Sequence, residues 1–333
     1  MSSIGYKPAQ NVSSTQKRLI EKLSRELGSE CMNALADATV IEIMLNSDGT
    51  LWVERFGEPI VCIGEMSESK ARALLGTIAS YLNTTITANN PILECELPID
   101  GSRFEGLLPP IVSRPSFTIR KKALNIFSLE EYVHNGMLSK QYYQLIKNAV
   151  YNPKNFYTPK KNILIVGGTG SGKTTLANAL IDAIAKQTPE DRLVIIEDTA
   201  EIQCPAKNHV LLRTSNHVNM LSLLRATMRL RPDRILVGEV RGAEALDLLK
   251  AWNTGHSGGI ATVHANSATA GLIRLEQLIA EATSAPMQTL IAEAIDLVVF
   301  ITKTPQGRMI KEIIQVKGFD TTKGIYKIST NLD

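Results

Sequence analysis

Residues 162–181 read NILIVGGTGSGKTTLANALI, and this stretch decides the fold of the second half of the chain. The segment 162–166 is short, apolar and partly β-branched, which predicts a buried strand. After the glycines, Leu176, Leu180, Ile181 and Ile184 fall on one face of a helix. The stretch between them fits G-x-x-x-x-G-K-[ST], so strand, loop and helix together predict a phosphate-binding P-loop.

Each residue type in this loop has a physical task. Glycines let backbone N–H groups close around phosphate oxygens, and the following helix contributes its free N–H groups and dipole. Lys173 is expected to reach the β- and γ-phosphates, and the Thr174 hydroxyl to help hold Mg²⁺. The expected ligands are therefore ATP and Mg²⁺. The candidate nucleotide-binding residues of the loop are Gly167, Gly168, Thr169, Gly170, Ser171, Gly172, Lys173, Thr174 and Thr175.

Composition sets broader limits. The 333 residues predict two domains, and a hydrophobic content of 44% is sufficient for real cores. A net charge of +3 is too mild to indicate nucleic-acid binding by itself. Four widely spaced cysteines without a C-x-x-C pair fit a reduced cytosolic protein and argue against a zinc site. Without a bilayer-length apolar run or a signal-peptide pattern, we expect a cytoplasmic protein that meets membranes only peripherally.

The pattern along the chain changes once. Residues 1–14 are expected to form a flexible tail, and 15–137 a small α+β domain that contains a hairpin around the turn 46–49. Within this part, Gly28 is expected to stop the first helix, and 128–150 to be helical behind a capping box at Ser128. A linker is expected over 138–155. From 156 to 333, strands alternate with helices, which predicts a doubly wound α/β domain.

Carboxylates follow two apolar strands of this second domain. Glu197, Asp198 and Glu201 come after LVII, and Glu239 follows ILVG. Such carboxylates are expected at the same sheet edge as the P-loop. Glu197 and Asp198 are candidates for catalysis or for Mg²⁺ binding through water. Glu239 stands where a Walker B acid belongs, but Gly238 replaces the usual Asp, so we expect Glu239 to orient or activate the attacking water.

Basic side chains are concentrated around the same segments. The predicted strand 258–263 delivers His264 to the site, and His256 is a weaker candidate. Four arginines lie near Glu239 in the sequence, and some of them are expected to form structural ion pairs with Asp233 or Glu244; they are Arg229, Arg231, Arg234 and Arg241. Of these, Arg231 is a candidate nucleotide contact.

Four segments stand in the order GGTGSGKTT, IEDTAEI, RPDRILVGEVRGAEALDLL and GHSGGIATVHANS. Together they resemble the Walker A, Asp box, Walker B and His box of the secretion and traffic ATPases. Three N-terminal stretches, VIEIMLNSDGTLWVERFG, RFEGLLPPIVSRPSFTIRK and FSLEEYVHNGMLS, resemble the type IV secretion branch. Over about residues 15–325 the likeness is strongest to the TrbB-type ATPases of conjugative transfer.

The resemblance also implies an architecture, an assembly and partners that the residues alone do not show. It implies a PAS-like N-terminal domain, a RecA-like ATPase domain, and a homohexameric ring at the cytoplasmic face of the inner membrane. The expected partners are inner-membrane components and a coupling protein of a secretion or conjugation apparatus. In this family, N-terminal arginines reach the terminal phosphates, and the matching positions are Arg103 and Arg120.

Other functions are less well supported. A type II secretion or pilus retraction motor would keep the same chemistry, but the tetracysteine module common in type II members is missing. A nucleotide-gated docking ring with slow turnover would not need complete catalytic boxes. A GTPase would need an N-K-x-D segment. For a helicase, we find no basic stripe with interleaved aromatic residues.

Overall fold

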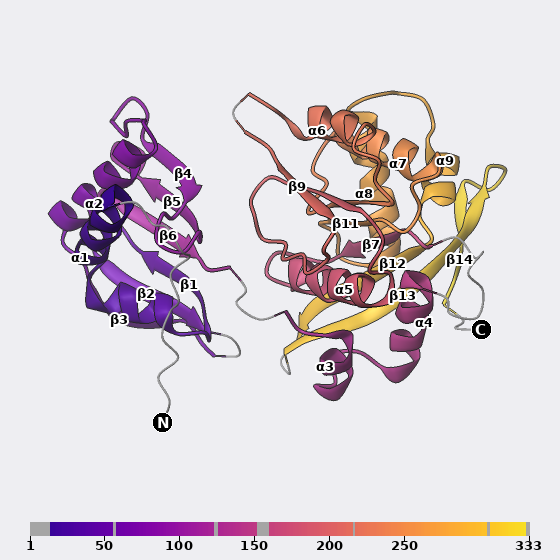
Figure 1. Ribbon diagram of the computed structural model, residues 1–333, viewed down its shortest axis with the longest axis horizontal. Coiled ribbons are helices and arrows are strands. Elements are labelled where there is room, and N and C mark those ends of the chain that lie inside the picture. The colour runs from indigo at the N-terminus through magenta and orange to yellow at the C-terminus, as the bar shows by residue number, and fades with distance from the viewer. Residues whose placement is uncertain are drawn as a thin grey trace. The chain divides into compact units, whose positions relative to one another are not determined.

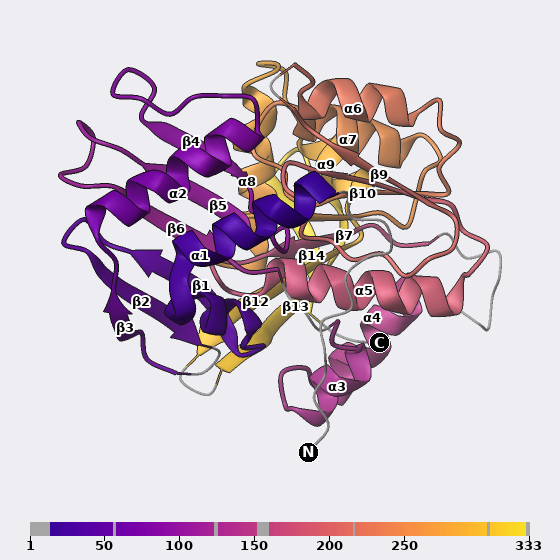
Figure 2. The same ribbon diagram turned by 60° about the vertical axis from the view of Figure 1, so that its left-hand side comes forward.

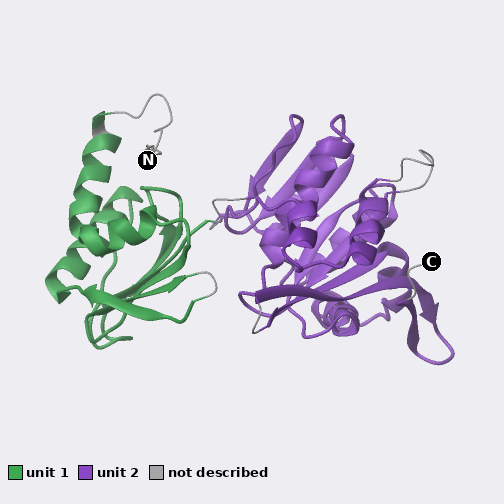
Figure 3. Ribbon diagram, turned by 90° about the horizontal axis from the view of Figure 1, so that it is seen from below, with its two compact units in different colours: residues 1–124 green, residues 125–333 purple. Residues whose placement is uncertain are grey.

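The computed structural model describes residues 14–55, 58–122, 126–151, 160–215, 217–304 and 307–330 (Figure 1). The chain divides into two compact units, residues 1–124 and 125–333, which Figure 3 colours separately. The expected tail over 1–14 lies outside the described residues except for Ser14, where the first helix begins. Among the helices of the described ranges, none combines the length and apolar character that a bilayer crossing requires.

Unit 1 is an antiparallel sheet with helices on one face, as Figure 2 shows. Its strands lie in the order β3-β2-β1-β6-β5-β4. The elements are α1 (Ser14–Ala36), β1 (Val40–Leu45), β2 (Thr50–Arg55), β3 (Val61–Glu65), α2 (Glu68–Tyr81), β4 (Ile92–Glu96), β5 (Arg103–Leu107) and β6 (Ser116–Arg120). The hairpin predicted around 46–49 is confirmed as β1 and β2. Gly28, with φ 83°, interrupts α1, and a second helical stretch continues after it.

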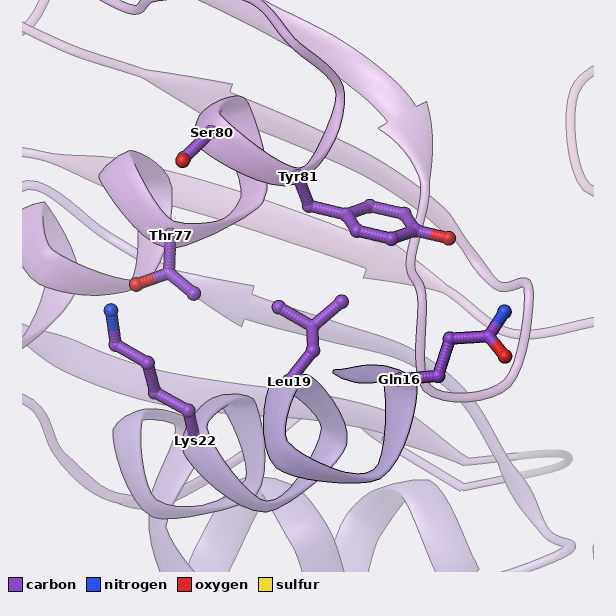
Figure 4. A pocket seen from close by; sticks show the side chains of 6 residues that line it. All are labelled: Gln16, Leu19, Lys22, Thr77, Ser80 and Tyr81. Atoms are coloured by element: carbon purple, nitrogen blue, oxygen red, sulfur yellow. The ribbon is translucent and has the colours of Figure 1, made fainter. Parts of the chain in front are cut away.

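The core of unit 1 follows from alternation along its strands. Phe104, Phe117 and Ile119 point to the helix-covered face and are almost fully buried among Leu23, Leu27, Leu74 and Ile78 of α1 and α2. Alternate residues face the other side, where α1 and α2 do not pack. A shallow groove between α1 and α2 is lined by Gln16, Leu19, Lys22, Thr77, Ser80 and Tyr81 (Figure 4). None of these residues belongs to the predicted nucleotide site.

Unit 2 is built on a mostly parallel sheet in the order β14-β13-β12-β7-β11-β10-β8-β9. Strands β12, β7, β11, β10, β8 and β9 pair in parallel, and β13 and β14 add antiparallel strands. The elements are α3 (Leu129–His134), α4 (Lys140–Val150), β7 (Ile163–Val166), α5 (Lys173–Gln187), β8 (Leu193–Glu197), β9 (His209–Arg213), α6 (Met220–Thr227), β10 (Arg234–Val237), α7 (Glu244–Asn253), β11 (Ile260–Val263), α8 (Ala268–Ala280), α9 (Gln288–Ala294), β12 (Leu297–Thr304), β13 (Gly307–Asp320) and β14 (Ile325–Ser329).

Both faces of this sheet are covered, so its central strands are apolar on both sides. Leu164 and Val166 of β7 pack with α7 and α8 in one core, whereas Ile163 and Ile165 pack with α4 and α5 in a second core on the opposite face. The same division holds along β10 and β11. The doubly wound α/β prediction is therefore confirmed.

The boundary between the units differs from the expected linker at 138–155. The units divide between residues 124 and 125, and 126–150 belong to unit 2. Helix α3 begins at the predicted capping box of Ser128, and α4 buries Ile146, Ala149 and Val150 against α5. An amphipathic helix that joins a core cannot act as a linker. The rest of the expected linker, 152–155, lies outside the described residues.

Arg234 fastens the amino end of the parallel sheet. Its side chain is only 1% exposed, and Nε donates to Asp191 Oδ2 at 2.7 Å. The Nη atoms donate to the Gly258 and Val150 carbonyls at 3.1 and 3.0 Å and to the Thr188 hydroxyl at 3.3 Å. One guanidinium therefore joins β10 to the ends of α4 and α5 and to the loop before β11. Burial alone would raise the pKa of Asp191, but hydrogen bonds from Lys160, Arg234 and Thr188 outweigh it and lower that pKa.

We predict that Arg234→Ala lowers the free energy of unfolding of unit 2 by about 3–5 kcal/mol, because it removes the buried cation that pairs with Asp191 and leaves that carboxylate with the more exposed Lys160. The Asp191 contribution is fully present above the unfolded-state pKa of about 4. It is lost as the pH falls through the lowered folded-state pKa, so the variant should show a weaker loss of stability on acidification. Urea denaturation at a series of pH values measures both effects. Arg229→Ala, at an exposed position nearby, is the control, and equal effects of the two variants would contradict this role.

Candidate functional site

The order of the parallel strands brings the four predicted motifs together at the carboxyl ends of the strands, which form one edge of the unit 2 sheet. The P-loop follows β7, the His264 segment follows β11, Glu239 follows β10, and Asp198 follows β8. Neighbours in the sheet run β7-β11-β10-β8, so the order in space differs from the order along the chain. The strand that carries His264 lies between the strands that carry the P-loop and Glu239.

The side chains contact one another in this same order. Lys173 Nζ lies 3.3 and 3.4 Å from the two ring nitrogens of His264. His264 Nε2 lies 2.6 Å from Oε1 of Glu239. The other Glu239 oxygen, Oε2, accepts from Nε and Nη2 of Arg241 at 2.9 and 2.6 Å. Arg241 Nη1 lies 3.3 Å from Asp198, which completes a polar chain across the sheet edge.

The P-loop has the backbone shape that its sequence predicts. Gly170 and Gly172 have φ angles of 68° and 96°, in the left-handed region that favours glycine. Lys173 is buried, and its Nζ donates to the Gly167 and Gly168 carbonyls, both at 3.0 Å. Lysine is thus held over the loop, where a phosphate would meet its charge.

Several features of the loop fit a phosphate ligand. Within the described ranges, no side chain caps the amino end of α5 at Gly172, and the amino end of a helix attracts anions. A Cβ atom placed on Gly168 or Gly170 would meet no described atom within 4 Å, so this side of the loop is open. The Ser171 hydroxyl oxygen is buried and finds no hydrogen-bond partner among the described residues. The donors present therefore match a nucleotide phosphate.

The carboxylates after β8 differ in what they contact. Glu197 is buried, and its Oε1 accepts from the backbone N–H groups of Glu201 and Ile202 at 3.0 and 2.8 Å. Burial raises the pKa of Glu197, and these two hydrogen bonds oppose the shift. Glu197 thus holds the shape of the loop through Oε1, and its expected catalytic or metal-binding role stays a prediction. Glu201 is the carboxylate that reaches the P-loop, since its Oε2 accepts from Thr174 Oγ1 at 3.1 Å.

Asn178, one turn after Thr174 on α5, was not identified from the sequence. It is buried, and its Oδ1 accepts from the backbone N–H of Gln203 at 3.0 Å, while its Nδ2 donates to the Glu201 carbonyl at 3.4 Å. A polar residue on the otherwise apolar face of α5 was the signal that could have identified it. Together with Thr174, it ties the P-loop helix to the loop after β8.

Some predicted residues are not brought to this edge. Arg231 precedes β10 and Glu239 follows it, so the strand separates them, and Arg231 is exposed with φ 53°. Arg234 also lies at the amino end, where it pairs with Asp191 instead of the expected Asp233 or Glu244. His256 precedes β11, and its Nδ1 lies 3.2 Å from the Ala251 carbonyl. The positions of these residues before their strands, not after them, explain the difference.

Arg103 and Arg120 lie in unit 1, where they are direct partners across the β5–β6 pair. Glu96 pairs with Arg103 on one side, and Glu42 pairs with Arg120 on the other. Both arginines lie on the sheet face that α1 and α2 leave uncovered, since Phe104 and Ile119 beside them point into the core. This row of the sheet therefore places two cations side by side between two carboxylates.

Comparisons with known proteins agree with this geometry. The family model described as Type II/IV secretion system protein matches residues 25–312. A probable conjugal transfer protein TrbB of Sinorhizobium fredii is 52% identical over 314 residues, which are 94% of each chain. The type IV secretion system protein VirB11 of Bartonella quintana is 33% identical over 282 residues, which cover 74% of this chain and 78% of that protein.

A solved structure shares the fold. The Legionella pneumophila ATPase DotB superposes with a TM-score of 0.61 at 18% identity, covering 93% of this chain and 83% of DotB. This likeness confirms the architecture of an N-terminal α+β domain and a RecA-like ATPase domain. The resemblance drawn from the four ordered motifs is also confirmed. The chain belongs to the family of type II/IV secretion system proteins, and it is a P-loop ATPase of the type IV secretion branch.

Proposed function

We propose that this ATPase is the motor of a conjugative type IV secretion system, in which ATP hydrolysis powers pilus assembly and the transfer of a DNA–protein substrate. The observation that carries the chemistry is the chain of contacts from Lys173 through His264 to Glu239 and Arg241. The observation that carries the biological setting is the 52% identity to a conjugal transfer protein over nearly the whole chain.

The chain's own residues suggest the following division of tasks. Lys173, held at the mouth of the P-loop, neutralises charge on the β- and γ-phosphates. Glu239 orients the attacking water and accepts its proton, since its carboxylate is 18% exposed and lies at the edge where that water would stand. Arg241 fixes the carboxylate by two hydrogen bonds to Oε2, so Oε1 faces His264. His264, 46% exposed, is placed to contact the charge that develops on the transferred phosphoryl group.

The oxygen donors next to the P-loop fit Mg²⁺. Mg²⁺ is usually bound by one or two protein oxygens together with substrate phosphates, and it would supply positive charge to the β- and γ-phosphate oxygens. Thr174 Oγ1 and the adjacent Glu201 carboxylate are the groups that we propose to hold it, directly or through water. Asp198 is less suited, because it already accepts from Thr214 and pairs with Arg241.

We also propose that the arginine pair of unit 1 contributes to binding the terminal phosphate in the assembled protein. The cross-strand pairing of Arg103 with Arg120 supports this, because two neighbouring guanidinium groups on one face can give a γ-phosphate charge-assisted hydrogen bonds. Because ADP lacks that phosphate, the arginines would distinguish ATP from ADP. Such a difference in contacts is what a nucleotide-driven movement requires.

A ring assembly, with a hexamer as the family implies, is the proposed working form. The unit 2 sheet ends in two different edge strands, β9 and β14, which expose Leu211 on one side and Ile325 and Ile328 on the other. A ring needs two different surfaces that join head to tail, and open sheet edges with apolar side chains are suited to this.

The family resemblance and the charge of α1 both bear on where the protein works. We propose that the ring works at the cytoplasmic face of the inner membrane, beside inner-membrane components and the coupling protein of the apparatus. The exposed basic residues Lys17, Arg18, Lys22 and Arg25 on α1 support a peripheral contact, because basic side chains are attracted to anionic lipid surfaces.

The first prediction concerns Glu239. Glu239→Gln keeps the shape of the side chain but removes the base, so turnover should fall by at least about a hundredfold while ATP still binds. Lys173→Ala should abolish turnover and also weaken nucleotide binding. Phosphate release measures turnover, and a fluorescent ATP analogue measures nucleotide binding.

If Glu239→Gln loses ATP affinity together with turnover, the residue acts mainly on the metal and not on the water. In donor cells, either variant should stop conjugal transfer, and normal transfer would contradict the proposed motor.

The second prediction separates ATP from ADP. Arg103→Ala and Arg120→Ala should each weaken ATP binding about tenfold, as expected for a lost hydrogen bond between charged groups, and leave ADP binding unchanged. Arg114→Ala is the matched control, because Arg114 is an exposed arginine of the same unit. Isothermal titration of both nucleotides measures the difference. Equal losses for ATP and ADP, or the same loss in the control, would rule out a contact with the terminal phosphate.

The third prediction concerns assembly. A charged side chain on an edge strand opposes pairing with another chain. Leu211→Glu and Ile328→Glu should therefore each convert the ring into smaller species in light-scattering measurements. Ile273→Glu, at an exposed position on α8, is the control and should leave the assembly intact. Intact rings in both edge variants would show that the sheet edges are not the contact.

A further inference from the structure

The strands β12 and β13 form a platform against which the P-loop packs. A Cβ atom placed on Gly167 would collide with the Ile301 carbonyl oxygen of β12. One placed on Gly172 would lie 2.8 Å from Cδ of Arg308, near the start of β13. Glycine is therefore required at 167 by the backbone of β12 and favoured at 172 by a left-handed φ of 96°, with the Arg308 side chain close by, whereas a Cβ atom on Gly168 or Gly170 would meet no described atom within 4 Å.

Arg308 also contacts the loop through a hydrogen bond. Its Nε donates to the Gly170 carbonyl at 3.2 Å. In a planar trans peptide, the carbonyl and the following N–H point in opposite directions. The bond to Gly170 therefore fixes the direction of the Ser171 N–H, which points into the loop and reaches the Gly168 carbonyl at 3.3 Å.

The strand that carries Arg308 is itself anchored. The backbone N–H of Ile310 donates to the Met137 carbonyl at 2.9 Å, which ties β13 to the segment after α3. Arg308 also lies close to the buried Tyr132 of α3: burial raises the pKa of Tyr132, and the charge of Arg308 opposes that shift. The guanidinium thus lies near both the P-loop and the buried Tyr132 of the unit 2 core.

We propose that Arg308 is a positioning residue of the nucleotide site, which holds the Gly170–Ser171 peptide and so keeps the P-loop in the folded shape, with the Ser171 N–H on the Gly168 carbonyl, in which the loop would receive a phosphate. This inference rests on the proposed function of the P-loop. In this role Arg308 acts through the hydrogen bond from its Nε–H to the Gly170 carbonyl. The positive charge of the side chain is not sufficient. Because the β-phosphate is common to ATP and ADP, Arg308 affects the binding of both.

The test compares Arg308→Ala and Arg308→Lys with Lys311→Ala, which removes an exposed positive charge from the same strand. Lysine keeps the charge but has no N–H at the position of Nε. Both Arg308 variants should weaken ATP and ADP binding about tenfold, the scale of one hydrogen bond to a charged group. Hydrogen exchange without nucleotide should be faster in the peptide 167–175 of both Arg308 variants, and Lys311→Ala should behave as wild type.

Each other outcome has a definite meaning. Full binding in Arg308→Lys would show that charge alone acts, which overturns the positioning role. Unchanged exchange in Arg308→Ala, or the same losses in Lys311→Ala, would also overturn it. Loss of ATP binding without loss of ADP binding would place Arg308 at the terminal phosphate instead. A wild-type protein that binds neither nucleotide would contradict the proposed function itself, and this result is separate from all of the others.

Discussion

The insertion of β11 between β7 and β10 is the constraint on which the site depends. Val263 pairs with Val166 on one side, and Ala261 pairs with Val237 on the other. Because parallel strands in register end together, the residues that follow them meet at one edge. The Thr262 hydroxyl also donates to the Gly238 carbonyl at 2.7 Å, which holds the segment of Glu239 beside β11. His264 can therefore contact both Lys173 and Glu239.

The sequence was sufficient for the features that depend on local pattern. The strand, glycine loop and helix at 162–187 were predicted because periodicity and motif agree within one short stretch. The capping box at Ser128 and the hairpin around 46–49 were predicted for the same reason. The linker expected at 138–155 is wrong over 140–150, because the apolar face of α4 packs in the core of unit 2.

Features that depend on strand order could not be predicted. No local pattern shows that β11 lies between β7 and β10, so the central place of His264 was not apparent. The sequence singles out Glu197 and not Glu201, yet the structure shows that Glu197 holds the loop and that Glu201 reaches Thr174. Arg308 follows the P-loop by more than a hundred residues and carries no motif, and only the pairing of β12 with β7 and β13 brings it near.

The P-loop glycines satisfy two constraints at once, and this changes how substitutions there should be interpreted. Gly172 combines a left-handed backbone with a contact to Arg308, and Gly167 lies against the Ile301 carbonyl. A side chain at Gly167 would collide with the backbone of β12, and one at Gly172 would strain the left-handed backbone and displace the Arg308 side chain. The same substitution at Gly168 would meet open space and act only on the ligand side. Loss of activity in a Gly167 or Gly172 variant can therefore come from a disturbed loop backbone as well as from a lost phosphate contact.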